Sequence, residues 1–138
     1  MLDETDLQIL NLLTENARMQ WQKIGEEVHL TGQAVKNRIN KMEKLGVLQG
    51  YTIKVNSKLI GKELIAFVTV FMKTTDHGSF RKFIQNNTLI VEANRISGEG
   101  CYLIKVITST QEEIVDLLDE ILKYGNYKVN LSIENIKY

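Results

Sequence analysis

The hydrophobic pattern at the start of the chain predicts an amphipathic helix. Asp3 is a suitable N-cap, Asp6 stands at the third helical position as an imperfect capping-box partner, and the helix ends near Asn16. The apolar positions have the spacing of one broad buried stripe: Leu7, Ile9, Leu10, Leu12 and Leu13. A stripe of this width needs neighbouring helices to cover it.

Two further helices are predicted on either side of a short turn. Trp21, Ile24 and Val28 lie at helical spacing, and Thr31 is a suitable N-cap for the helix after the turn. His29 stands where such turns usually have Gly, so we expect it to adopt a positive φ, which His tolerates better than most residues. Helix, short turn, helix is the helix-turn-helix motif, whose second helix enters the major groove of DNA.

The helix predicted after Thr31 has one apolar and one polar face. Val35, Ile39 and Met42 recur at intervals of four and three residues, which places them together on a buried face. The opposite face carries polar side chains: Gln33, Lys36, Asn37, Asn40, Lys41 and Lys44. Gln and Asn can pair bidentately with adenine, and Lys and Arg with guanine or phosphate. This face is a candidate for reading bases, although charge patterning alone favours an ordinary solvated face.

From residue 64 the pattern changes to short strands and helices. The predicted order is strand 64–72, helix 77–85, strand 89–96, turn 97–100, strand 101–107, a helix capped by Thr110 and Glu113, and strand 129–133. The second of these helices buries Ile114, Leu117, Leu118, Ile121 and Leu122 and stops at Gly125, and the last strand alternates through Val129, Leu131 and Ile133. The order strand, helix, strand, strand, helix, strand predicts a ferredoxin-like βαββαβ fold.

Composition limits the function classes. The 138 residues have a formal net charge of zero, which argues against a nucleic-acid binder that works by bulk charge. The segment from Gln33 to Lys44 is nevertheless a local positive stripe, because Glu43 is its only acid against four basic residues. Cys101 is the single cysteine and cannot form an internal disulfide, which fits a cytoplasmic protein. The apolar runs fall far short of the ~20 residues of a membrane-spanning helix, so no membrane partner is expected.

A family resemblance rests on two stretches of the N-terminal half. These read LDETDLQILNLLTENAR and IGEEVHLTGQAVKNRINKMEKLGVLQGYTIKVNSKLIG, with LD-x-x-D-x-x-IL and V-x-x-RI-x-x-x-E-x-x-GV-x-x-GYT as their specific elements. They strongly resemble the leucine-responsive regulatory protein (Lrp/AsnC, feast/famine) family of prokaryotic transcription regulators, and the resemblance covers essentially the full chain. It implies an α+β protein, with a (winged) helix-turn-helix followed by a ferredoxin-like effector and oligomerisation domain.

The resemblance also implies a division of the chain into three parts. Residues 1–50 would form the DNA-binding domain, residues 51–62 a strand and linker that include GYTIKVN, and residues 63–138 the effector-binding and dimerisation domain. Carried over position by position, it implies that these side chains face DNA: Thr31, Gln33, Lys36, Asn37, Asn40 and Lys41. Arg38 matches the arginine of the family's RI pair and is a candidate either for contacting a phosphate or for packing the helices.

The second half of the chain predicts self-association. Its strands supply more apolar surface than a lone half-covered sheet can hide, which favours a partner sheet from a second chain. The resemblance implies a homodimer, assembled further into an octamer of four dimers. A dimer would present two recognition helices to half-sites about one DNA turn apart. Several weak contacts on one duplex would then add through multivalency.

The turn within ISGEGCYLI is a candidate effector site. Gly98 and Gly100 can expose backbone amides to a carboxylate, and Glu99 can take an ammonium group, as an amino acid would require. In the family, this turn and the acid after it lie near an effector pocket between dimers. Cys101 stands where the family usually has Asp, so the usual amino-acid contact does not carry over to this position. The alternative is a plain hairpin with Cys101 as a small buried residue.

These observations lead to one main function and several alternatives. The main hypothesis is a sequence-specific, DNA-binding transcription regulator modulated by an amino acid or a related small molecule. The alternatives are an architectural DNA-wrapping protein and an amino-acid-binding module with little role on DNA. An enzyme is not expected, because neither His29 nor His77 belongs to a recognisable motif and there is no phosphate loop or acid/base pair. We therefore expect no catalytic residue, no metal site and no cofactor.

Overall fold

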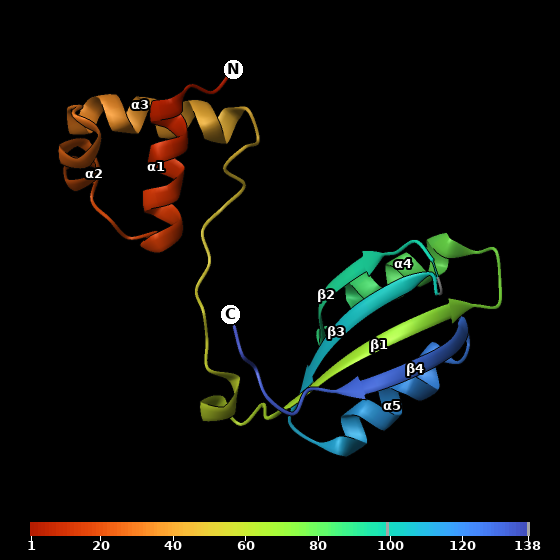
Figure 1. Ribbon diagram of the computed structural model, residues 1–138. Helices are drawn as coiled ribbons and strands as arrows, with labels where there is room; N and C mark the ends of the chain where they lie inside the picture. Colours follow the sequence, from red (N-terminus) through yellow and green to blue (C-terminus); the bar gives the residue numbers. More distant parts are fainter. Residues whose placement is uncertain (99, 138) are drawn as a thin grey trace. The chain divides into compact units, whose positions relative to one another are not determined.

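The computed structural model describes residues 1–98 and 100–137, so the candidate effector residue Glu99 lies outside the described part of the chain. The chain divides into two compact units, Met1–Lys54 and Val55–Tyr138. Each unit has a hydrophobic core of its own (Figure 1).

The first unit is built from three helices. They are α1 (Glu4–Glu15), α2 (Trp21–Val28) and α3 (Gly32–Lys44). Their shared core consists of Ile9, Leu13, Ile24, Val35, Ile39 and Met42, all of them buried. The helix-turn-helix prediction and the buried stripe of α3 are confirmed. The stripe of α1 is narrower than predicted, because Leu7 is exposed and only the sector that faces the other two helices is covered.

The caps of α1 and α3 explain where these helices begin. Asp3 and Asp6 form a complete capping box, in which each carboxylate accepts a hydrogen bond from the other residue's amide, at 2.8 and 3.1 Å. Asp6 is thus a full capping-box partner rather than an imperfect one. The Thr31 hydroxyl accepts a hydrogen bond from the Ala34 amide at 3.1 Å, as predicted for an N-cap.

The turn between α2 and α3 depends on two unusual backbone positions. His29 has a φ of 61°, so the predicted positive φ is confirmed. The Leu30 amide donates to the Gly25 carbonyl at 2.9 Å, and a Cβ on Gly25 would collide with the Leu30 carbonyl oxygen. The turn can therefore fold back on α2 only because residue 25 lacks a side chain.

The segment after α3 differs from the prediction. GYTIKVN was expected to be a strand, but residues 51–56 are extended without forming one, and residues 1–54 contain no β-wing. A strand needs hydrogen-bonding partners, and the described part of one chain pairs no other segment with this one. Tyr51, Ile53 and Val55 consequently remain exposed along it, and a short 3₁₀ turn, Ser57–Ile60, follows.

The described residues of the second unit form a ferredoxin-like α+β arrangement, as predicted. Its elements are β1 (Leu64–Met72), α4 (His77–Asn86), β2 (Ile90–Arg95), β3 (Tyr102–Thr108), α5 (Gln111–Ile121) and β4 (Gly125–Leu131). The strands pair antiparallel in the order β2-β3-β1-β4. Both helices cover the same face of the sheet, where they pack on alternate strand residues such as Val68, Val70 and Ile104 (Figure 1).

The end of this unit departs from the predicted pattern. The last strand begins at Gly125 instead of Val129, while Leu131 and Ile133 are exposed, and so is Leu122 at the end of α5. Gly125 pairs with Met72 on β1, and a Cβ at this glycine would collide with the backbone of the neighbouring Phe71. Gly125 therefore serves the close approach of two strands in addition to following a helix.

Candidate nucleic-acid interface

The exposed face of α3 is mostly neutral and hydrogen-bonding at its centre. Because Val35, Ile39 and Met42 are buried, the amide side chains of α3 are on the solvent side. The Gln33 Nε2 donates to the Asn37 Oδ1 at 3.1 Å, which orders two of these amides along the helix. A shallow groove of about 480 Å³ follows the same surface, lined by Asn37, Asn40, Lys41, Lys44 and Leu45. The strip of amide side chains, Gln33, Asn37 and Asn40, is called the reading face.

One edge of the reading face is bordered by an aromatic residue of α2. The Lys36 Nζ lies 5.3 Å from the centroid of the Trp21 ring, within the range of a cation–π contact. Trp21 is exposed and comes from the first position of α2, and the backbone of Gly32 packs closely against the start of that helix. The N-termini of α2 and α3 are therefore adjacent. Lys36 lies between Trp21 of α2 and the reading face.

The other edge is tied to α1 by an ion-pair network. The Arg38 Nη1 donates to both carboxylate oxygens of Asp3, at 2.8 and 2.7 Å, and to Asp6 Oδ1 at 3.1 Å. The Arg38 side chain therefore makes the helix-packing contact that was one of its two predicted roles. The Lys41 Nζ donates to Asp6 Oδ2 at 2.7 Å. Two of the cations predicted to face DNA are thus engaged by carboxylates within the protein.

Asp6 is the centre of this network. Its side chain is 0% exposed, whereas that of Lys41 is 43% exposed. Burial raises the pKa of Asp6, but hydrogen bonds from Lys41, from the Asp3 amide and from Arg38 outweigh burial and lower the pKa to about 2. Asp6 is consequently ionised at neutral pH and holds both α3 cations against α1.

Trp21 and Asp6 border the interface, yet the sequence assigned neither of them a role there. Trp21 was read only as an apolar position of α2, and Asp6 only as a cap. The sequence did contain a signal for the role of Asp6. A carboxylate beside a leucine-rich stripe faces the core and needs a cation as its partner. The cations lie 32 and 35 residues away, so no local pattern identifies them.

The predicted effector turn packs against β1. Gly98 and Gly100 have positive φ values, and a Cβ on Gly100 would clash with the side chain of Thr69. The Cys101 amide donates to the Val70 carbonyl at 2.8 Å, and its side chain is half-buried against the core. The Cys101 amide is thus already used in the fold. Of the four candidate effector residues, the structure describes three: Gly98, Gly100 and Cys101.

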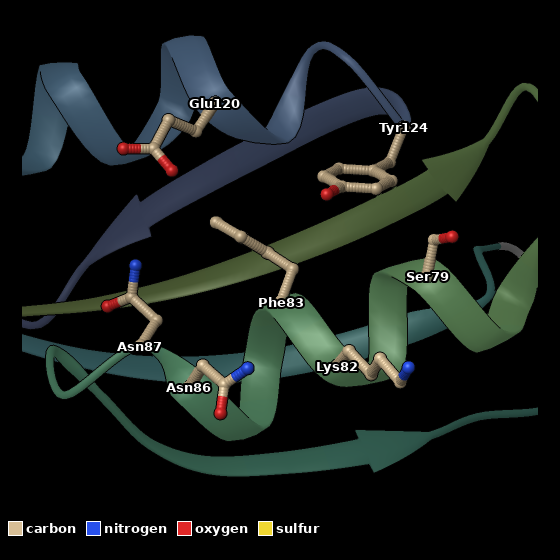
Figure 2. Close-up of a pocket in the computed structure, with 7 residues that line it drawn as sticks. All are labelled: Ser79, Lys82, Phe83, Asn86, Asn87, Glu120 and Tyr124. Atoms are coloured by element: carbon tan, nitrogen blue, oxygen red, sulfur yellow. The ribbon is translucent and has the colours of Figure 1, made fainter.

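A separate groove of about 510 Å³ lies between α4 and α5 (Figure 2). Phe83 projects from α4 toward α5, and its ring centroid lies 5.3 Å from that of Tyr124. Lys82 and Glu120 are on opposite helices, and both are exposed. The three described residues of the candidate effector turn are absent from this groove, which is lined by Ser79, Lys82, Phe83, Asn86, Asn87, Glu120 and Tyr124.

Residues 1–98 and 100–137 contain no group of three or more His, Cys, Asp and Glu side chains that could hold a metal ion. Within the same residues, none of the helices has the length and apolar character needed to cross a membrane.

The fold and the residues of α3 can now be compared with known proteins. The AsnC-type helix-turn-helix domain matches residues 2–43, and the Lrp/AsnC ligand binding domain matches residues 65–138. The HTH-type transcriptional regulator LrpB of Bacillus subtilis is 48% identical over 136 residues, which cover 99% of this chain and 91% of LrpB.

Solved structures agree with this assignment. The structure of B. subtilis LrpC has a TM-score of 0.92 at 26% identity and covers 99% of this chain and 98% of LrpC. A complex of the transcriptional regulator NMB0573 with L-Met, from Neisseria meningitidis, has the same fold, with a TM-score of 0.92 at 23% identity, covering 100% of this chain and 94% of that one. The resemblance seen in the sequence is confirmed: this chain belongs to the Lrp/AsnC family of HTH-type transcriptional regulators.

Proposed function

We propose that this regulator binds double-stranded DNA as a dimer and reads bases with the exposed face of α3. The observation that carries the proposal is the division of α3 into a buried apolar face and an outer strip of amides. Gln33, Asn37 and Asn40 are suited to adenine edges, and Lys36 to guanine or phosphate. Thr31 and the N-terminus of α3 are suited to a phosphate. Residues 1–50 then form the reading domain.

The roles of Arg38 and Lys41 are narrower in this proposal than in the sequence-based one. Both side chains bind carboxylates of α1, so Arg38 holds α3 in place and Lys41 lies at the margin of the reading face. Lys44, at the end of α3, contributes mainly charge. Affinity per subunit is therefore modest, and it rises when several subunits bind one duplex.

Dimerisation through the second unit supports this mode of binding. Phe67 and Leu103 are 39% and 37% exposed on the sheet face that α4 and α5 leave bare, although they belong to the two central strands. Residues 63–138 would pack this face on a second copy, and the extended segment within residues 51–62 would pair with its counterpart. Four such dimers would form the octamer.

The regulator is further proposed to respond to an amino acid or a related small molecule. Its second unit matches a domain described as ligand binding, and the related fold of NMB0573 was solved with L-Met. The turn with Gly98 and Gly100 is the proposed contact, with Cys101 in place of the acid that the family usually has. A regulator of this kind acts on chromosomal DNA in the cytoplasm, without catalytic activity.

A gel shift with the DNA upstream of the regulator's own gene tests the reading face. The affinity should fall steeply as salt is raised. We expect Lys36→Ala and Asn37→Ala each to weaken binding about 5- to 100-fold, because a good base contact is worth about 1–3 kcal/mol. Asn11→Ala, an equivalent truncation on the exposed side of α1, is the matched control and should have no effect. Unchanged affinity in both α3 variants would refute this reading face.

Three further measurements separate the remaining parts of the proposal. Calorimetric titration with the twenty amino acids identifies an effector, and repeating the gel shift with that amino acid shows whether it alters DNA binding. Light scattering distinguishes a dimer from an octamer. Footprinting distinguishes a local regulator, which protects a short site, from an architectural protein, which protects a long wrapped one.

A further inference from the structure

Asp3 and Asp6 of α1 bind Arg38 and Lys41 of α3 in one ion-pair network. It contains two carboxylates and two cations, so its net charge is zero. Each cation lies within 3.1 Å of a carboxylate oxygen, and Asp6 contacts both of them. Half of the four basic residues of α3 are therefore matched by acids inside the same unit.

The balance of charge in the whole unit matches this arrangement. Residues 1–54 contain seven acidic and seven basic side chains, which is unusual for a surface that must approach a polyanion. With Arg38 and Lys41 neutralised, Lys36 and Lys44 are the basic residues of α3 that remain to attract phosphates. The amides of the reading face lie between them.

DNA cannot easily take these two cations from the network. If a phosphate captured Lys41 or Arg38, the Asp6 carboxylate, which is 0% exposed, would lose a charge partner while still buried. Breaking a buried pair in this way is costly, because it leaves an uncompensated charge in a poorly solvated site. The two cations should therefore release few counterions when the protein binds a duplex.

We propose that Asp6 is a specificity-determining residue, which suppresses binding to DNA of any sequence by neutralising Lys41 and, together with Asp3, Arg38 from within the protein. Sequence-independent affinity comes almost entirely from cations that meet phosphates. Removing two of them from that task leaves discrimination to Gln33, Asn37 and Asn40. This inference rests on the proposed function, because it requires α3 to lie against DNA.

The first test compares Asp6→Asn with Glu4→Gln in the full chain. Glu4 is an exposed acid in the first turn of α1, so its replacement removes the same charge without touching Arg38 or Lys41. We expect Asp6→Asn to bind a random-sequence duplex about tenfold more tightly at low salt. The slope of log affinity against log salt should steepen by about 1 relative to Glu4→Gln, because Lys41 loses its carboxylate partner while Arg38 keeps Asp3, and each released cation contributes about 0.9.

The specific site should be affected less than random DNA. The ratio of affinities for the upstream fragment and for a scrambled duplex should therefore fall in Asp6→Asn and stay constant in Glu4→Gln. Equal slopes and affinities in the two variants would overturn the proposal. A folded Asp6→Asn variant that loses DNA binding would also overturn it, because the network would then be needed for binding rather than limiting it.

If Asp6→Asn fails to fold, a second pair of variants tests whether Lys41 contacts a phosphate. Lys44→Met should lower the salt slope by about 0.9, and Lys41→Met should lower it by less than half as much. Equal losses would show that Lys41 meets a phosphate as fully as Lys44 does, and the proposal would be wrong. If the unmodified protein binds no duplex at low salt, the proposed function itself fails. That outcome can be told apart from a failure of this inference, which appears only as a difference between variants.

Discussion

The two units of this regulator bury their apolar surface in different ways. In residues 1–54, three helices enclose a core whose six members are all buried, and the outward face of α3 is polar. In the second unit, α4 and α5 cover one face of the sheet (Figure 1), while Phe67 and Leu103 of the two central strands are exposed on the other face.

This difference assigns separate tasks to the two units. A helical unit that completes its core within one chain can present side chains to another type of molecule. A sheet with exposed aromatic and aliphatic residues on its central strands gains about 25 cal/mol for each Å² of apolar surface that a second sheet covers. The folding of residues 1–54 and the assembly of subunits should therefore fail independently, and the following changes test that separation.

The largest loss of stability should come from a substitution in the core of residues 1–54, called here the reading unit. Ile39→Ala removes a fully buried side chain at the meeting point of the three helices and should cost about 2–5 kcal/mol. Thermal unfolding followed by circular dichroism should show an early transition for residues 1–54, with loss of DNA binding. Light scattering at a temperature below the second transition should still show a dimer. A monomer under those conditions would contradict the separation.

Disrupting the exposed face of the sheet should dissociate the dimer while residues 1–54 stay folded. Phe67→Glu replaces an exposed aromatic side chain of that face with a charge, so we expect monomers by light scattering and an affinity for DNA about 100-fold lower because the second α3 is lost. The helices α1, α2 and α3 should unfold at an unchanged temperature. Val115→Glu, which alters an exposed residue on α5, is the control and should remain dimeric. A dimeric Phe67→Glu variant would place the interface elsewhere.

Acid should act mainly on the reading unit. The folded pKa of Asp6 is about 2, below its ordinary value of 3.8, so its contribution to stability is complete above about pH 5 and disappears as the pH falls toward 2. A shift of this size corresponds to about 2 kcal/mol. Thermal unfolding between pH 5 and pH 2 should show the first transition falling in the unmodified chain and falling less in Asp6→Asn. Equal acid sensitivity in both proteins would argue against this origin.

The smallest expected effect is a gain in stability within the reading unit alone. His29 has a left-handed backbone, which costs a residue with a Cβ about 1 kcal/mol. His29→Gly should relieve that strain and raise the first unfolding transition by a few degrees, while the second transition and the dimer stay unchanged. Substituting Gly at Gln8, which lies within α1, is the reverse control and should lower the first transition.

Local patterns predicted most of this fold because the information lies within a few residues. Val35, Ile39 and Met42 share a face through helical spacing alone, and Thr31 caps its helix through a residue three positions away. The unpredicted features depend on distant partners. Asp6 meets cations more than 30 residues along the chain. The segment around Ile53 has the composition of a strand but lacks a partner in the described chain.

The strip of amides on α3 also has a consequence for how such regulators diverge. Exchanges among Gln33, Asn37 and Asn40 change hydrogen-bonding patterns without changing the charge of the unit or touching its core. With the reading face proposed above, a duplicated gene would acquire a new target by a few substitutions that leave the charge unchanged, while stability, assembly and background attraction to DNA stay constant. Families of paralogous regulators in one genome can arise by this route with little risk to the fold at each step.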